Sequence, residues 1–569
     1  MDKRPVFMIL SSILFGSVLF CSPVAATSHH DPTPTIESAE IKAYKTSQSH
    51  RKASFSWDQK GSISAVIHPG TPQAAGMREA PLRKIDEVIT QAMRDNVISG
   101  AVVYIVRRGM IVKQKAYGYA KQYEDDTFTQ SKQPIPMRMD TMFDLASISK
   151  LFTTTAAMKL YEQGKFSLDD PVAKYIPEFA QNGKENVTIR QLMTHTSGLA
   201  AWIPLYTMGT NRDDRLQIVF AQPLEHPPGT TYVYSDLNMI TLGALVERLS
   251  GVRLDQFVYR YITKPLGMNN TMYNPPLLKK RRIAATEYQP WTGRGMVWGE
   301  VHDENAWALD GVAGHAGLFS TARDLAIFAS MFLQNGTYGG KRILQPETVQ
   351  LLMENQIPQF PGYDHGLGWE LAQGWYMDAL SEHTSFGHTG YTGTSIVVNP
   401  NNNVIAILLT NRVHPTRNTP SINPLRRQVS RLTADAIPVA IPGKKAAWFA
   451  GYGDHLNAIL STKVVARKQL TLTFDTWYRM EPDVDFGVVE VSQDGEHWRQ
   501  VGEQLTGSSD WTTKTVPIPA HTVAIRFRYC TDSSVNGRGW YVTNIRLVDD
   551  DGKELETLWE SHDWERRTF

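Results

Sequence analysis

The chain has 569 residues, 42% of them hydrophobic, which is too long for one ordinary core and predicts two or more domains. Lys and Arg together number 58, Asp and Glu together number 57, and no basic block stands out. This balance argues against a nucleic-acid-binding protein and favours small or locally charged partners.

The first 26 residues have the order of a secretory signal peptide. A charged start precedes an apolar run over residues 6–20, and small residues ending at Ala26 follow. We therefore predict cleavage after Ala26 and an exported protein that is secreted, cell-wall-associated or periplasmic. A membrane anchor is the weaker alternative, because the run is shorter than the roughly 20 residues that span a bilayer. No later segment is long and apolar enough to span.

The next stretch predicts a polar connection followed by the beginning of a folded domain. Residues 27–75 are polar with little periodicity and predict an extension or linker. Apolar residues then follow helical spacing over 82–92. Two strand-like runs, 101–106 and 110–117, come next and predict a hairpin that turns at Arg108-Gly109.

Helical patterns dominate the middle of the chain, and strands return after it. The predicted helices cover residues 149–163, 189–194, 237–249 and 321–333. Strand-like runs at 394–398 and 404–409 flank an Asn-rich turn. Because helices are inserted between the two ends of a sheet, residues 76–437 predict an α+β domain.

The pattern changes again beyond a pair of prolines near residue 440. Apolar residues alternate with polar ones over 470–474 and 523–529, which is typical of half-buried strands. Asp494-Gly495 has the composition of a hairpin turn. Residues 443–569 therefore predict a separate, all-β sandwich.

Ser147 and Lys150 form a Ser-x-x-Lys motif at the opening of a predicted helix. Three-residue spacing puts the hydroxyl and the amine on one helix face, within hydrogen-bond reach. A partly desolvated lysine has a lowered pKa and can accept the serine proton, while the helix N-terminus favours a developing oxyanion. The motif alone is unspecific, since residues 49–52 hold a second copy and a helix N-cap is the alternative role for Ser147.

Two further elements follow in the order that an acyl-serine site needs. Tyr234 comes after Pro228-Gly229-Thr230 and just before a predicted helix, and His388-Thr389-Gly390 opens a strand-rich stretch. With the serine and lysine, they resemble the motifs of the class C β-lactamase and penicillin-binding-protein-like serine hydrolases. The resemblance covers roughly residues 77–437. It implies a β-lactamase/transpeptidase-like domain, with an antiparallel sheet flanked by helices plus a helical subdomain.

The same resemblance implies roles for the residues around the serine. Tyr234 would lie beside Ser147 and Lys150 and relay a proton to the leaving group, the alternative being a buried aromatic residue at a helix start. The backbone N–H groups of Ser147 and Tyr391 would form the oxyanion hole. Gly390 would allow the close approach of these backbones.

His388 is the preferred third element over His315. The segment after His388 predicts a hairpin, whereas the segment after His315 predicts the start of a helix. With Thr389 and Gly390, His388 would bind substrate. Histidine carries less positive charge than lysine at neutral pH, so recognition of a carboxylate would be weaker or pH-dependent. A strand-edge histidine without a function is the alternative.

Asp236 departs from the asparagine of the resembled family and belongs to the expected substrate site. Its carboxylate would repel an anionic substrate group, or hold Lys150 as an ion pair and keep the lysine pKa high. It could equally be the N-cap of the helix that starts at Leu237. The departure makes potent hydrolysis of β-lactams doubtful.

We expect neither a cofactor nor a catalytic metal, because no His-Glu-x-x-His motif or other recognised ligand spacing is present. The C-terminal segment resembles the jelly-roll modules of secreted bacterial peptidases such as immune inhibitor A. Four of its tryptophans suggest a sugar-binding platform or, alternatively, core residues: Trp477, Trp498, Trp511 and Trp540. Four of its acids suggest a structural calcium site or, alternatively, exposed loops: Asp475, Asp483, Asp485 and Asp532.

The sequence thus predicts an exported serine hydrolase that forms an acyl-enzyme at Ser147 and cleaves amide or ester bonds. By resemblance, the substrates are cell-wall-derived peptides, muropeptides or small esters, and the C-terminal domain could contact cell wall or carbohydrate. One alternative is a β-lactamase or a D-alanyl-D-alanine carboxypeptidase. Another is a penicillin-binding or cell-wall-binding protein with little turnover.

Overall fold

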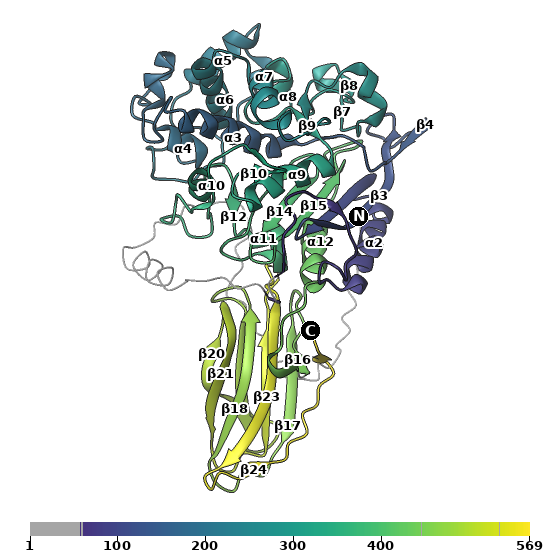
Figure 1. The fold of residues 1–569 in the computed structure, drawn as a ribbon, viewed down its shortest axis with the longest axis vertical. Helices are drawn as coiled ribbons and strands as arrows, with labels where there is room; N and C mark the ends of the chain where they lie inside the picture. The colour runs from purple at the N-terminus through teal and green to yellow at the C-terminus, as the bar shows by residue number, and fades with distance from the viewer. Residues whose placement is uncertain (1–56, 59–60, 445, 534) are drawn as a thin grey trace, which may run out of the picture.

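The computed structural model describes residues 57–58, 61–444, 446–533 and 535–569. The predicted signal peptide and most of the predicted polar extension lie outside the described residues. Figure 1 shows a broad α+β region, formed by the described residues up to 441, above a narrow sandwich formed by residues 447–569. The expected mixture of an α+β fold and a separate all-β region is confirmed. Within the described ranges, no helix is long and apolar enough to cross a membrane.

An eight-stranded sheet is the centre of the α+β region. Its order is β1-β3-β2-β15-β14-β13-β12, with β4 beside β3, and all pairs are antiparallel except β1 with β3. The predicted hairpin is present, because β2 pairs with β3 and the left-handed backbone of Arg108 and Gly109 makes the tight turn. The strands of this sheet are β1 (His68–Pro69), β2 (Gly100–Arg107), β3 (Met110–Tyr123), β4 (Gln130–Pro136), β12 (Glu370–Leu371), β13 (Phe386–Gly390), β14 (Thr394–Asn399) and β15 (Val404–Thr410).

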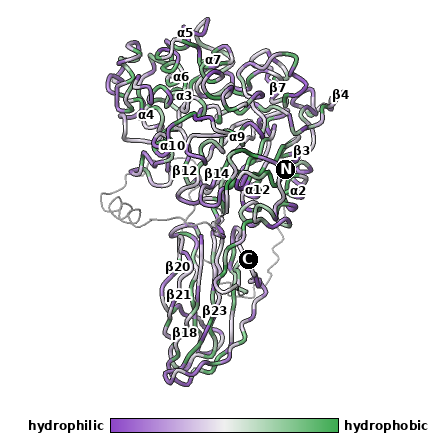
Figure 2. Tube along the Cα trace, in the orientation of Figure 1, coloured by the Kyte–Doolittle hydropathy of each residue, from purple (hydrophilic) through white to green (hydrophobic). Residues whose placement is uncertain are grey.

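Both faces of this sheet are covered by helices. Strand β2 is therefore apolar along its whole length, because its side chains enter a core on each face. Side chains alternate between the faces of a strand. Val102 and Tyr104 join the large core under α3 (Ser149–Glu162) and α9 (Ala322–Leu333), whereas neighbouring residues join a second core. Helices α2 (Glu79–Arg94) and α12 (Asn423–Asp435) pack together over that second core. Figure 2 shows hydrophobic residues concentrated along these central strands and helices.

The helical part lies above the sheet and is built around α3. This helix is buried on nearly every side and packs against α6 (Asp236–Ser250), which ends at the left-handed Gly251. The other helices are α4 (Ile189–Met193), α5 (Arg212–Phe220), α7 (Leu254–Val258), α8 (Glu304–Ala308), α10 (Pro346–Met353) and α11 (Gly374–Met377). Short strands complete the region: β5 (Phe143–Asp144), β6 (Met272–Tyr273), β7 (Tyr288–Gln289), β8 (Gly295–Met296), β9 (Leu318–Ser320), β10 (Thr337–Tyr338) and β11 (Lys341–Arg342).

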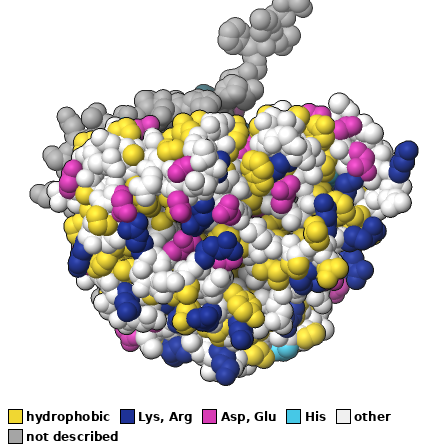
Figure 3. Space-filling view, turned by 90° about the horizontal axis from the view of Figure 1, so that it is seen from above, with side chains coloured by type: hydrophobic (Ala, Val, Ile, Leu, Met, Phe, Trp, Pro, Cys, Tyr) yellow, Lys and Arg dark blue, Asp and Glu magenta, His cyan; other side chains and the backbone are white. Residues whose placement is uncertain are grey.

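The surface of the α+β region carries charges of both signs. Figure 3, seen from above, shows Lys and Arg interspersed with Asp and Glu and with single hydrophobic side chains. This view agrees with the formal net charge of +1. No large field of one sign is visible on this face, so its charge pattern is not that of a polyanion-binding surface.

The sandwich consists of two antiparallel sheets. One has the order β21-β18-β23-β16-β25 with β24 beside β23, and the other has the order β17-β22-β19-β20. Phe527 and Trp540 meet in the core between the sheets with ring centroids 5.9 Å apart, so Trp540 is a core residue. The strands are β16 (Ala447–Phe449), β17 (Asn457–Lys463), β18 (Leu470–Arg479), β19 (Phe486–Ser492), β20 (Trp498–Leu505), β21 (Ser508–Ile518), β22 (Ala524–Cys530), β23 (Gly539–Asp549), β24 (Glu554–Leu555) and β25 (Glu565–Arg567).

A buried cluster of charges joins the sandwich to the α+β region. Asp435, at the end of α12, lies 2.7 Å from Arg567 and 3.6 Å from Arg538, both of which belong to the sandwich. Arg78, from the start of α2, lies 3.8 Å from the same carboxylate. The Arg538 side chain is 0% exposed, so the carboxylate compensates a guanidinium that water does not reach.

Replacement of Asp435 by Asn should therefore destabilise the protein strongly. The change removes one partner of a buried ion pair and leaves Arg538 without this counter-charge, which typically costs about 3–5 kcal/mol. Urea unfolding followed by tryptophan fluorescence measures the loss. Glu79→Gln is the control, because Glu79 pairs with Arg83 on an exposed helix face and should change stability little. Equal effects of the two substitutions would contradict the role given to Asp435.

Candidate active site

A pocket of about 530 Å³ opens where the helical part meets the sheet. Its walls come from the start of α3, from the segment before α6, from β12 and β13, and from the segment that leads into α12. The lining residues are Ser147, Tyr234, Glu370, Trp375, His388, Thr389, Gly390, Tyr391, Arg412, Thr419, Ser421, Ile422, Asn423 and Arg426. The structure thus brings together residues that lie nearly 280 positions apart in the chain.

Ser147 and Lys150 are in direct contact at the base of this pocket. Ser147 lies in a single 3-10 turn, η1 (Ala146–Ile148), which continues into α3. The Lys150 ammonium donates a hydrogen bond of 2.9 Å to Ser147 Oγ and another of 3.2 Å to the backbone carbonyl of His315. The Lys150 side chain is only 1% exposed. The predicted shared helix face is therefore present, and the amine is within reach of the serine proton.

Asp236 forms an ion pair with Lys150. Its Oδ1 lies 2.8 Å from Lys150 Nζ. The alternative role of Asp236 as the cap of α6 is wrong, because the Ser235 side chain accepts the N–H of Asn238 and caps the helix. Burial lowers the pKa of Lys150, but the charge of Asp236 and the contact with Tyr234, with the hydrogen bonds to both, together outweigh burial and raise that pKa above its usual value.

Tyr234 lies against the same lysine. Its hydroxyl is hydrogen-bonded to Lys150 and Ser147, and Lys150 Nζ is 4.8 Å from the centre of its ring. Burial raises the pKa of Tyr234, so the phenol keeps its proton at neutral pH. His195, which has a left-handed backbone, packs on this ring at 4.5 Å and accepts the N–H of Ser235 through Nδ1. His195 thus positions the segment that carries Tyr234.

The turn that presents Ser147 is held by a buried carboxylate. Asp144 accepts the N–H of Ala146 at 2.8 Å and the N–H of His302 at 2.6 Å. Ala146 has a φ of +46°, a conformation that costs energy for any residue except glycine. The hydrogen bonds of Asp144 hold this strained residue directly before the serine. Sequence reasoning missed Asp144, whose only signal was its place three residues before Ser147.

Strand β13 runs past the serine turn at very short range. A side chain at Gly390 would place its Cβ 2.3 Å from the carbonyl oxygen of Leu145 and 2.1 Å from Thr394 Oγ1. Only glycine therefore fits where the two backbones meet. Tyr391 follows at the rim of the pocket, 53% exposed. Beyond β13 in the sheet lies only the two-residue β12, which pairs with Phe386 and Gly387.

His388 is buried and cannot supply charge to a substrate at neutral pH. Burial, and then the charge of Lys150, lower its pKa to about 3. Its Nδ1 bonds to the carbonyl oxygen of Thr389 at 2.7 Å. The pH-dependent recognition of a carboxylate expected of His388 is therefore not supported, because the ring stays neutral throughout the physiological range.

The charges that face the pocket come from residues that sequence reasoning did not single out. Arg426, on α12, donates to the carbonyl oxygens of Gly390 at 2.8 Å and Thr394 at 2.9 Å. Arg412 also lines the pocket. Glu370, on β12, faces them, and burial raises its pKa to about 7. No sequence motif marks these residues, since they enter the site only through sheet pairing and helix packing.

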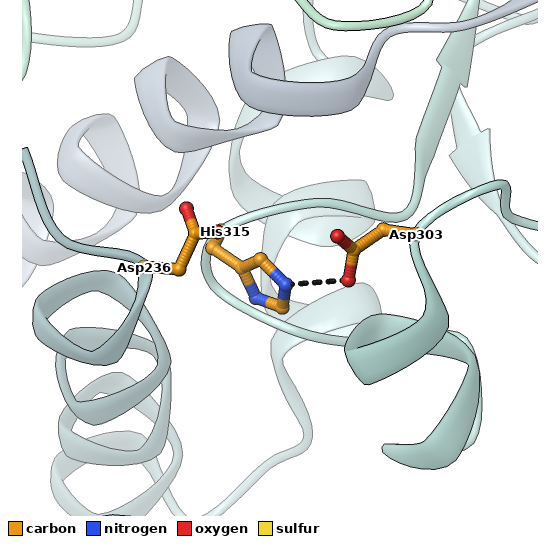
Figure 4. Close-up of side chains that lie close together, drawn as sticks. All are labelled: Asp236, Asp303 and His315. Carbon is orange, nitrogen blue, oxygen red and sulfur yellow. Dashed lines mark hydrogen bonds and ion pairs between the residues drawn. The ribbon is translucent and has the colours of Figure 1, made fainter. Parts of the chain in front are cut away.

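A second carboxylate and a buried imidazole extend the network behind Lys150. Figure 4 shows His315 between Asp236 and Asp303, and His315 Nε2 lies 2.8 Å from Asp303 Oδ1. One atom of each of the three side chains lies within 4.8 Å of the others, a spacing that suits a metal ion. The Lys150 ammonium already neutralises Asp236, and Asp303 is bonded to His315. These side-chain contacts account for the arrangement without a bound cation.

The family model described as Beta-lactamase matches residues 85–431 of this chain. A protein of Escherichia coli strain K12 named "Putative D-alanyl-D-alanine carboxypeptidase" is 33% identical over 399 residues, covering 64% of this chain and 90% of that protein. An N-acetylmuramyl-L-alanine amidase of Bacillus subtilis strain 168 is 34% identical over 374 residues, covering 60% of this chain and 82% of that protein. The family match includes the pocket and excludes the sandwich.

Solved structures with a similar chain path include EstCE1, described as a hydrolase with promiscuous acyltransferase activity. It is 25% identical, has a TM-score of 0.49, and covers 63% of this chain and 99% of its own. A penicillin-binding protein homolog from Caulobacter crescentus is 19% identical with a TM-score of 0.49, covering 66% and 100%.

Substitution of Asp236 by Asn should lower the pKa of Lys150, because it removes the charge that favours the ammonium. If neutral Lys150 activates Ser147, reactivity rises with pH through the lysine pKa. In a plot of labelling rate against pH, the rising part should then move to lower pH by about 1–3 units. The rate of Ser147 labelling by a fluorophosphonate, measured against pH, checks this shift. The control is Asp140→Asn, which removes a surface carboxylate that pairs with Arg282. An unmoved rising part in the Asp236 variant would contradict the electrostatic role.

Proposed function

This chain belongs to the β-lactamase family and is a serine hydrolase, and we propose that it cleaves amide bonds of cell-wall-derived peptides through an acyl-enzyme at Ser147. The observation that carries the assignment of the nucleophile is the 2.9 Å hydrogen bond between Lys150 Nζ and Ser147 Oγ inside the pocket. An otherwise weak nucleophile is activated when a base lies this close to its proton.

In the proposed reaction, Lys150 takes the proton of Ser147 while Oγ attacks the substrate carbonyl. The backbone N–H groups of Ser147 and Tyr391 stabilise the oxyanion, which the close approach of β13 at Gly390 makes possible. Tyr234 gives its proton to the leaving amine and regains one from Lys150. The C–N bond breaks and leaves an ester on Ser147. Water then attacks this ester, returns a proton to the serine and releases the acid.

Asp236 gives this site a negative charge beside Lys150, which a neutral side chain at the same position would not provide. A raised lysine pKa makes the neutral amine a minor species at neutral pH, so activation of Ser147 should be favoured at alkaline pH. The carboxylate would also repel an anionic substrate group that approached Lys150. Both effects disfavour efficient β-lactam hydrolysis.

The proposed substrate class rests on the pocket charges and on the names of the relatives. Arg412 and Arg426 offer positive charge, and Glu370 offers negative charge above about pH 7. Peptides that carry carboxylates together with an amine complement such a set. The E. coli relative is named as a carboxypeptidase and the B. subtilis relative as an amidase that acts on N-acetylmuramyl-L-alanine. A carboxypeptidase activity is thus the second candidate.

We also propose that the protein is exported, with the hydrolase domain over residues 76–437 and an accessory domain over 443–569. The charged, apolar and small-residue order of the first 26 residues supports export. The relatives named for cell-wall substrates are consistent with it. The sandwich would stabilise the hydrolase domain or attach it to a surface.

Intact-protein mass spectrometry tests the nucleophile. The wild-type chain should gain the mass of one fluorophosphonate, whereas Ser147→Ala should gain none, because the alanine has no hydroxyl. Ser149→Ala is the matched control, since Ser149 is buried and its hydroxyl accepts the N–H of Leu318. A labelled Ser147→Ala variant would contradict the assignment of Ser147 as the nucleophile. Purified muropeptides then separate the two activities, because an amidase releases the whole peptide and a carboxypeptidase releases only D-alanine.

Glu370 should make substrate binding depend on pH. Its carboxyl, with a pKa of about 7, is neutral below that pH and anionic above it. For a peptide with a free amine, KM should fall as pH rises through about 7, and Glu370→Gln should flatten this change while kcat falls less. Steady-state kinetics between pH 6 and 8.5 give both values. A KM profile that keeps its inflection in the variant would assign the titration to another group.

A further inference from the structure

Three carboxylates meet at the end of the sandwich that faces the α+β region. Glu481 follows β18, Asp485 precedes β19, and Asp532 follows β22. One oxygen of each lies within 4.8 Å of the other two. Of the four acids singled out in the sequence, Asp485 and Asp532 therefore come together, and Glu481 joins them. Asp475 lies elsewhere, bonded to Thr513 on β21.

The Asp485 carboxylate is buried, and one of its two oxygens lacks a hydrogen-bond partner among the described residues. Asp485 is 0% exposed. Its Oδ1 accepts the N–H of Asp532 at 3.2 Å, whereas Oδ2 has no hydrogen-bond partner among the described residues. Glu481 Oε2 and the hydroxyl of Tyr529 are also buried without a partner in that part of the chain. A buried polar atom left without a partner costs about 1–3 kcal/mol, so three such atoms at one place need an explanation.

The carboxylates of this cluster raise one another's pKa values. Burial, and then the charges of Asp532 and Asp485, raise the pKa of Glu481 to about 8. Burial likewise raises the pKa of Asp485 to about 7, and the carboxylates of Asp532 and Asp454 add to the effect. Two arginines of α12 near this junction pair with other carboxylates. Arg427 is bonded to Asp454, and Arg431 bridges Asp454 and Asp378.

We propose that Glu481, Asp485 and Asp532 bind one calcium ion. Two oxygens on opposite sides of a Ca²⁺ ion, each at 2.3–2.6 Å, are about 5 Å apart, which matches the observed spacing. Carboxylate oxygens are hard ligands, and neither histidine nor cysteine is part of the cluster. The oxygens belong to three separate segments, and Ca²⁺ tolerates such irregular geometry better than Mg²⁺, which requires a near-ideal octahedron.

The site lies at the junction between the two regions. Asp532 is tied to the neighbouring segment, because its carbonyl oxygen accepts the N–H of His455. The adjacent Asp454 pairs with Arg427 and Arg431 on α12, the helix that also supplies the pocket residue Arg426. A bound ion would therefore brace the end of the sandwich against the helix that lines the active site.

The test uses the full-length protein stripped with EDTA and dialysed. Metal content after incubation with calcium and gel filtration should be one ion per wild-type chain and none for Asp485→Asn. Asp550→Asn, in an exposed turn of the same sandwich, is the matched control and should bind as wild type does. Saturating calcium should raise the wild-type melting temperature by about 2–4 °C.

The calcium-free Asp485→Asn variant separates binding from mere structural damage. Without calcium it should melt at or above the wild-type temperature at pH 8, because the amide removes repulsion, and calcium should leave its melting temperature unchanged. Magnesium at equal concentration should raise the wild-type melting temperature less than calcium does. Wild type that retains no calcium at millimolar free ion, or an Asp485→Asn variant that binds as tightly as wild type, would overturn the proposal.

Discussion

The buried ammonium of Lys150 is the constraint around which the α+β region is arranged. A charged group removed from water is tolerated only when neighbouring groups replace its hydration. Here Ser147, Asp236 and a backbone carbonyl surround it, each from a different segment. The turn η1 supplies the serine, helix α3 supplies the lysine, the start of α6 supplies the carboxylate, and the loop before β9 supplies the carbonyl. The packing that stabilises the buried ammonium therefore also determines the chemistry of the pocket.

Ser147, the proposed nucleophile, is held in place by a strained neighbouring residue as well as by charge. Ala146 adopts a left-handed backbone before Ser147, and Asp144 compensates with a hydrogen bond to its N–H. Strand β13 then approaches so closely that Gly390 is the only residue that fits. Together these contacts fix the serine beside the lysine and close to strand β13, where the proposed oxyanion hole lies. Such preorganisation is what stabilisation of an oxyanion requires.

Much of the fold followed from local patterns. The hairpin at Arg108-Gly109 and the helix at Ser149 were predictable because side-chain periodicity and turn residues act over a few positions. The alternation in the C-terminal strands likewise indicated a sandwich. The second core under α2 and α12 was not predictable in this way. It depends on segments from both ends of the α+β region meeting across one sheet, and no local pattern records that pairing.

The motif residues Ser147, Lys150, Tyr234 and His388 could be named from the sequence, because each belongs to a short pattern whose chemistry is local. Their ion pairing and protonation could not be predicted from the sequence. Whether Asp236 capped a helix or paired with Lys150 depended on which side chain reached the ammonium, and whether His388 carried charge depended on burial. Arg426, Glu370 and Glu481 belonged to no sequence motif. Distance and dielectric environment are properties of the folded chain, and they decide protonation and ion binding once residue types are set.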